Sequence, residues 1–166
     1  MGALCNLVDI VLFVFFLVIV VAAPLLDAQT CLPQHLFPPF LVELKSWYAQ
    51  EFGDYLVSEK PHFFVGLIWV ELFFQWPLAL ASLYAIAAGK SWLNTTCLIY
   101  GASTLTSMVA ILAELTRSKR AADQLLKMYF PFLGLAVLAL LRGLFGHSEK
   151  NVTLGKRPYL LRKKRA

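Results

Sequence analysis

The stretch "FFVGLIWVELFFQWPLALASLYAIAA", residues 63–88, has the length and composition of a membrane-spanning helix. Such a helix needs roughly 20 predominantly apolar residues to cross the hydrocarbon core of a bilayer. Glu71 is the one charged residue in this stretch. A charged side chain at the centre of a span costs about 2.5–3.5 kcal/mol on insertion scales. We therefore expect Glu71 to face the interior of a helix bundle.

The chain as a whole is also strongly apolar. Of its 166 residues, 59% are hydrophobic and 15% are charged, whereas soluble domains carry about 25% charged residues. We therefore predict an all-α membrane protein, in which residues 1–145 form a four-transmembrane-helix bundle and residues 146–166 form a basic cytoplasmic tail. The four predicted spans are residues 4–26, 63–88, 95–115 and 125–145.

Basic residues concentrate after the last predicted span. Eight of the fifteen lysines and arginines lie at or after Arg142, which is typical of a cytoplasmic tail facing anionic lipid and does not require nucleic acid as a partner. With four spans, both termini would then be cytoplasmic. Lys163 and Lys164 have the spacing of a dilysine signal for retrieval to the endoplasmic reticulum. The alternative is a plain polybasic tail.

Two further patterns bear on the first span and on metal binding. The span could be a cleaved signal peptide, but its first six residues contain no lysine or arginine, and its apolar run exceeds the usual seven to fifteen residues. Cys5, Cys31 and Cys97 do not have the spacing of metal ligands. We predict no metal site and no cofactor.

The connection between the first two spans contains "PPFLVELKSWYAQEFG", residues 38–53. Two prolines suit the start of a helix, a glycine suits its end, and apolar residues recur at spacings of three and four. We predict a short amphipathic helix in this first luminal loop. It would either lie on the membrane surface or cap the bundle.

Three polar or irregular features surround the middle of the second span. Gln75 lies four residues after Glu71 on the same helix face. Pro77 removes a backbone donor, which favours a kink and a gap. If the gap reaches Asp27 at the end of the first span, the two carboxyl groups cannot both ionise in a low-dielectric pocket. The pocket would then carry about one negative charge.

Such a pocket suits an apolar ligand with one cationic group, or a sterol whose hydroxyl needs an acceptor. Alternatively, Glu71 and Gln75 are polar contacts between helices without a ligand. We expect aromatic side chains of the second and fourth spans to form the walls: Phe63, Phe64, Trp69, Phe73, Phe74, Trp76, Tyr129, Phe130 and Phe132.

The motifs "LPQHLFPPFLVELKSWYAQEFGD" and "FFVGLIWVELFFQWPLALASLYAIAAGK" resemble the sigma-2 receptor (transmembrane protein 97) family of the EXPERA group, in a plant-like form. The resemblance implies an endoplasmic reticulum protein with an EXPERA-like bundle whose cavity binds sterols and cationic amphiphiles. It implies Asp27 as counter-ion of a ligand amine, Glu71 as its protonated partner, and Asp54 as a supporting acid. It also implies a pocket lined by Tyr48, Gln75, Ser107 and Phe132, the last replacing an expected tyrosine.

The same resemblance implies a receptor-like role in sterol homeostasis or trafficking, with a homodimer and a sterol transporter as protein partners. The enzymatic alternative is a sterol isomerase of the emopamil-binding type, in which Glu71 and Asp27 supply acid and base. That isomerase also uses a histidine within its spans, whereas His35, His62 and His147 lie in predicted loops or at span ends. A third alternative is a non-catalytic membrane assembly factor.

Overall fold

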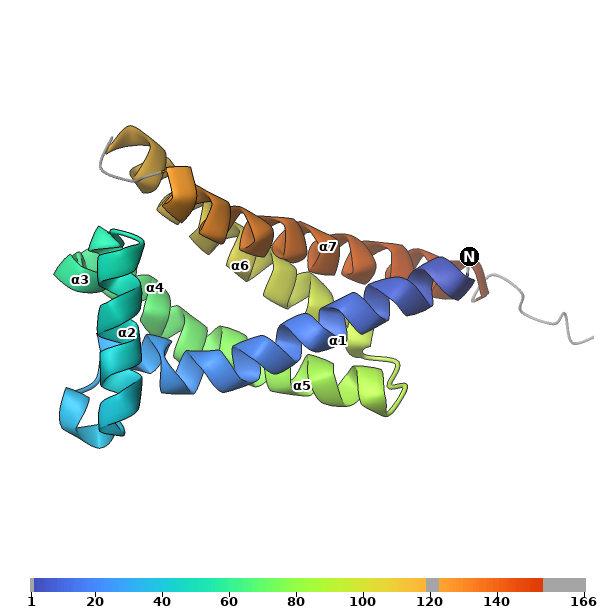
Figure 1. Ribbon diagram of the computed structural model, residues 1–166. Coiled ribbons are helices and arrows are strands. Elements are labelled where there is room, and N and C mark those ends of the chain that lie inside the picture. The colour runs from blue at the N-terminus through green and yellow to red at the C-terminus, as the bar shows by residue number, and fades with distance from the viewer. Residues whose placement is uncertain (1, 119–122, 154–166) are drawn as a thin grey trace, which may run out of the picture.

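The computed structural model describes residues 2–118 and 123–153, and these residues form helices without a strand (Figure 1). The prediction of an all-α, four-span membrane protein is confirmed. Four helical segments are long and apolar enough to cross a membrane: Cys5–Thr30, His62–Ala87, Leu93–Arg117 and Asp123–Phe145.

The first and second spans each contain a change of helix type. The first consists of an α-helix and a 3₁₀ turn, and the second of two α-helices joined by a π-helical turn. The third and fourth spans lie in single long helices. In chain order these elements are α1 (Gly2–Leu25), η1 (Asp27–Thr30), α4 (His62–Val70), η3 (Glu71–Gln75), α5 (Trp76–Ala87), α6 (Leu93–Arg117) and α7 (Asp123–Thr153).

The connection between the first two spans contains η2 (Gln34–Leu36), α2 (Pro39–Glu51) and α3 (Tyr55–Glu59). Here α2 confirms the predicted short helix. Pro38 precedes it, and Gly53 follows it with a φ of 63°, a left-handed conformation that glycine adopts without steric cost. Figure 1 shows α2 at one end of the bundle, beside α3 and across the ends of α1 and α4.

Two glycines let α6 and α7 pack closely along their length. A Cβ atom on Gly101 would lie 2.5 Å from the backbone nitrogen of Leu140, and one on Gly143 would lie 2.6 Å from that of Leu98. Small residues at such crossings are typical of membrane helices, which associate through close van der Waals contact. In Figure 1, α6 and α7 diverge from α1 and α4 toward the end where α2 lies.

Two apolar clusters hold the bundle together. The first joins α1, α5, α6 and α7, and in it the rings of Phe16 and Tyr100 meet edge to face at 5.0 Å between centroids. The second joins α3, α4, α6 and α7 around Leu56, Phe64 and Leu115. Many large apolar side chains remain on the outer surface, as lipid contact requires, and Phe73 is 74% exposed.

Candidate functional site

A cavity of about 400 Å³ lies within the bundle at the end where α2 crosses it. Pockets for small molecules usually have volumes of about 300–1,000 Å³, with mostly apolar walls and a few convergent polar groups. This cavity follows that description. Its polar lining residues are Asp27, Thr30, Lys45, Tyr48, Glu71, Gln75, Tyr100, Thr104, Ser107 and Tyr129.

The two predicted acids both line this cavity. Asp27 is the first residue of the 3₁₀ turn after α1, and Glu71 is the first residue of the π-helical turn in the second span. The cavity reaches both carboxyl groups, which are half-buried. Within residues 2–118 and 123–153, neither group has a hydrogen-bond partner or an ion pair within 4 Å. Both acids are therefore available to a ligand.

The π-helical turn lies where Pro77 predicted an irregularity. The backbone N–H of Trp76 donates to the carbonyl of Glu71, five residues earlier. Pro77 has no N–H and cannot make the α-helical bond to Phe73, so the wider turn accommodates it. The indole Nε1 of Trp76 also donates to the carbonyl of Val20 in α1, at 3.0 Å. The sequence predicted the break in this helix but not its π-helical geometry.

Gln75 both lines the cavity and joins two spans. Its side chain is only 4% exposed. Its Nε2 donates to Ser103 Oγ at 3.0 Å and to Ser107 Oγ at 3.4 Å, and its Oε1 accepts from Thr104 Oγ1 at 3.3 Å. The predicted polar contact between helices therefore exists at Gln75, and it fixes Ser107 beside the cavity.

Asp54 lies behind the cavity wall and is fully buried. Its carboxylate accepts from the backbone N–H groups of Leu56 at 3.1 Å and Val57 at 3.3 Å, which caps α3. It also accepts from the hydroxyls of Tyr129 at 2.8 Å and Tyr48 at 3.4 Å. Burial, with Asp54 nearby, raises the pKa of Tyr48. Asp54 thus orients two tyrosines that line the cavity.

Sequence reasoning missed Lys45, a cationic residue in the cavity wall. Its Nζ donates to the carbonyl of Leu26 at 2.9 Å and to Thr30 Oγ1 at 2.6 Å. Burial lowers the pKa of Lys45 to about 8, although the charge of Asp27 acts in the opposite direction. Its spacing of three from Tyr48 was a usable signal, because residues three apart share a helix face.

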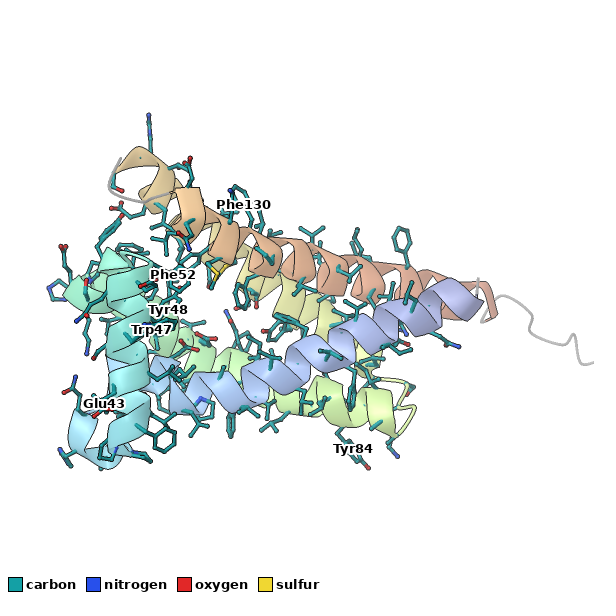
Figure 2. All side chains as sticks on the ribbon, viewed as in Figure 1. Glu43, Trp47, Tyr48, Phe52, Tyr84 and Phe130 are labelled. Carbon is teal, nitrogen blue, oxygen red and sulfur yellow. The ribbon has the colours of Figure 1, made fainter. Side chains whose placement is uncertain are left out.

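The prediction of the aromatic walls is largely wrong. Of the nine aromatic residues expected there, the cavity is lined by Phe64, Tyr129 and Phe132. Phe132 packs 6.4 Å from Phe15, centroid to centroid, and has no hydroxyl to offer. Figure 2 shows Phe130 pointing away from the bundle. The other five residues that do not line the cavity are Phe63, Trp69, Phe73, Phe74 and Trp76.

Arg142, near the end of the fourth span, pairs with an acid of the first span. Its guanidinium donates to Asp9 in a bidentate arrangement, with distances of 2.7 and 3.2 Å. A third bond of 2.6 Å runs from Nη1 to Asn94 Oδ1. This cluster links α1, α6 and α7 and explains why Asp9 is tolerated in the first span.

The remaining predictions concern metals and the tail. In the part of the chain that the structure describes, there is no group of histidine, cysteine and carboxylate side chains that could hold a metal ion. Cys5, Cys31 and Cys97 are free thiols. Lys163 and Lys164, the predicted retrieval signal, lie outside the described residues.

Fold and cavity together define a multi-pass helical membrane protein with a mostly apolar cavity inside its bundle, into which a few polar groups converge. Residues 40–143 match the EBP family, described as EXPERA (EXPanded EBP superfamily), and the chain belongs to this family. Most of the cavity wall falls within the matched residues, whereas Asp27 precedes them.

Three similar proteins share the name Sigma intracellular receptor 2. The chain is 35% identical over 107 residues to those of Macaca fascicularis and Homo sapiens, covering 64% of this chain. The Xenopus tropicalis protein is 29% identical over 160 residues, covering 87% of this chain and 92% of the relative. The matched region spans 61% of the macaque and human proteins. These findings confirm the resemblance to the sigma-2 receptor family.

Proposed function

We propose that this protein is a receptor-like protein of the endoplasmic reticulum membrane that binds sterols and cationic amphiphiles in its cavity. One observation carries the proposal: Asp27 and Glu71 line an apolar cavity of about 400 Å³, and neither has a hydrogen-bond partner or an ion pair within 4 Å among the described residues. A buried polar group without a partner costs free energy. A ligand that supplies a donor or a cation removes that cost.

The walls and the acids fit different parts of such a ligand. A sterol ring system or the apolar part of a drug-like amphiphile would pack against side chains such as Ile68, Met108 and Phe132. A ligand hydroxyl would donate to a carboxylate, and a ligand amine would pair with Asp27. Asp54 would act indirectly, by holding Tyr48 and Tyr129 in place.

The name of the relatives supports a receptor role for this chain too. We extend the proposal to sterol homeostasis or trafficking, with both termini in the cytoplasm and Lys163 and Lys164 as the retrieval signal. A homodimer and a sterol transporter are the protein partners that fit this role.

Two carboxyl groups in one cavity also keep a second function open, because an isomerase that moves a ring double bond needs an acid and a base. The test is to measure binding and isomerisation of one sterol with the same purified protein. We expect saturable binding and no isomer by gas chromatography with mass spectrometry, which separates double-bond isomers of equal mass, with Glu71→Gln weakening the binding. Isomer formation that Glu71→Gln abolishes would identify an enzyme.

The variant Glu71→Gln also distinguishes a third possible function, that of a membrane assembly factor, from the receptor and the isomerase. If Glu71→Gln abolishes ligand binding but restores function in cells that lack the protein, the ligand site is dispensable. We expect instead that ligand binding and function in cells are lost together.

A further inference from the structure

Lys45 places a positive charge in the same cavity as the two acids. Its ammonium is fixed, because it donates to the carbonyl of Leu26 at the end of α1 and to the hydroxyl of Thr30. Among the described residues, it has no ion pair within 4 Å with Asp27, although the two charges interact electrostatically. The charge of Lys45 therefore acts on Asp27 electrostatically, but Lys45 does not occupy the position of a ligand at the Asp27 carboxyl group.

Lys45 also borders a second, more polar cavity of about 230 Å³ on the other side of α2, lined by Gln29, Ser58 and Lys60. Lys45 and Val57 are common to the walls of both cavities, and of these two Lys45 is the charged residue. Lys60 lines the polar cavity alone, where its Nζ donates to the carbonyl of Gln29 at 3.1 Å. The two lysines lie near each other and each bonds to a backbone carbonyl, but they differ in access to the apolar cavity.

The charge balance of the apolar cavity follows from these positions. Two carboxyl groups in one low-dielectric cavity do not both ionise, so together they carry about one negative charge. The ammonium of Lys45 offsets that charge. A cationic ligand that approaches Asp27 must then overcome repulsion from Lys45, whereas an uncharged ligand with a hydroxyl can donate to a carboxylate without that repulsion.

We propose that Lys45 makes the cavity selective for uncharged, hydroxyl-bearing amphiphiles such as sterols over cationic amphiphiles. The inference rests on the proposed function and narrows its ligand class. Lys45 is thus a specificity-determining residue, while the acids remain the groups that contact the ligand's polar atom.

A purely structural role is the competing explanation, because Lys45 also satisfies the carbonyl at the end of α1. Two variants separate the roles. Lys45→Gln keeps a hydrogen-bond donor and removes the charge, and Lys45→Arg keeps both. Lys60→Gln is the matched control, because it removes an equal charge from a lysine that lines the polar cavity alone.

The experiment uses the full-length protein in lipid nanodiscs with two probes, radiolabelled cholesterol and a fluorescent amphiphile with a quaternary ammonium group. We expect Lys45→Gln to tighten binding of the ammonium probe about tenfold, the scale of an interaction between two unit charges roughly 12 Å apart at an effective dielectric constant of about 20. Cholesterol affinity should change by less than about threefold, a difference well below the tenfold step. Lys45→Arg and Lys60→Gln should resemble the wild type.

An unchanged ratio of the two affinities in Lys45→Gln, with cholesterol still bound, would overturn the inference and leave the proposed function intact. Equal tightening by Lys45→Gln and Lys60→Gln would also overturn it, because general surface charge would then explain the effect. If neither probe binds any variant, the proposed function itself fails. Thermal unfolding verifies folding, and Lys45→Met replaces Lys45→Gln if the latter does not fold.

Discussion

Three charged side chains at the α2 end of the bundle share one apolar cavity: Asp27, Lys45 and Glu71. Each comes from a different element, and two of them begin irregular helical turns. In a low-dielectric site, the protonation of one group changes the interaction of the others with a ligand. The preference of this cavity for charged or uncharged ligands is therefore determined by few atoms.

Changing Asp27 to asparagine preserves its size and removes its charge. We expect affinity for a quaternary ammonium amphiphile to fall at least about tenfold, the factor that corresponds to about 1.4 kcal/mol. Competition binding measures the loss, and the thermal unfolding temperature should not change. Glu43→Gln is the control, because Glu43 is exposed on α2 and does not line the cavity. Unchanged affinity in Asp27→Asn would contradict the role of Asp27.

The pH dependence of binding tests Lys45 separately. Since burial lowers the pKa of Lys45 to about 8, this lysine loses its proton as the pH rises from 7 to 9. The repulsion then disappears, so affinity for a quaternary ammonium probe, which does not titrate, should increase over this range. The charged or titratable groups that face Lys45 are Asp27, Cys31, Asp54 and Lys60, with Glu71 and Tyr48 also in the cavity wall.

The control for this pH dependence is Lys45→Arg, which stays charged throughout the range. Its affinity should remain nearly constant between pH 7 and 9. A parallel increase in the wild type and in Lys45→Arg would assign the titration to another group, and a flat wild-type profile would contradict the lowered pKa of Lys45.

Sequence reasoning located some of these residues and missed others for a physical reason. Glu71 stands out because a charge inside a span is costly. Lys45 does not stand out by its residue type, because a lysine in a loop helix resembles any solvated residue, and only its spacing of three from Tyr48 places it on the cavity face. The contact between Asp9 and Arg142 joins distant spans, and periodicity within one helix says nothing of such pairs.

At the scale of elements, the second span differs most from a regular helix. Its π-helical turn directs Glu71 and Gln75 to the cavity, while Phe73 and Phe74 face outward. The position of the break follows from Pro77. The sequence does not distinguish aromatic residues that face the bundle interior from those that face the lipid, because both environments are apolar. In a soluble helix, polar residues would have marked the outer face.

The pairing of α6 with α7 depends on Gly101. We expect Gly101→Val to lower the free energy of unfolding by about 1–3 kcal/mol or more, because its side chain would overlap the backbone of Leu140. Thermal or denaturant unfolding in detergent measures this effect. Gly134→Ala in α7 is the control, since no atom lies within 4 Å of its added Cβ. Equal stability of Gly101→Val and the wild type would contradict the close approach.

For the whole molecule, composition and span length were sufficient to predict the four spans. The positions of proline and glycine and the apolar periodicity predicted the short helix between the first two. They do not determine how far the spans diverge, because that depends on which faces pack, and on small residues such as Gly101 and Gly143. The cavity lies where α6 and α7 move apart from α1 and α4 toward α2 (Figure 1). The volume of the cavity therefore could not be predicted from the sequence, although the two acids in its wall, Asp27 and Glu71, could.

The proposed location gives a prediction for the whole protein in cells. If Lys163 and Lys164 form a retrieval signal, replacing both by serine should move the protein from the endoplasmic reticulum to later secretory compartments. Fluorescence imaging measures the distribution, and replacing Lys156 and Arg157 by serine is the control for lost tail charge. Retention of the double-serine variant in the reticulum would reject the signal.

The central claim is that the ligand occupies the cavity inside the bundle and not the lipid-facing surface. The most direct measurement is photo-crosslinking with a photoreactive sterol in native membranes, followed by mass-spectrometric mapping. We expect adducts on cavity residues such as Ile68, Met108 and Phe132, and we expect excess sterol to displace them. Adducts confined to outward residues such as Phe73 and Phe74, or insensitive to competition, would contradict it.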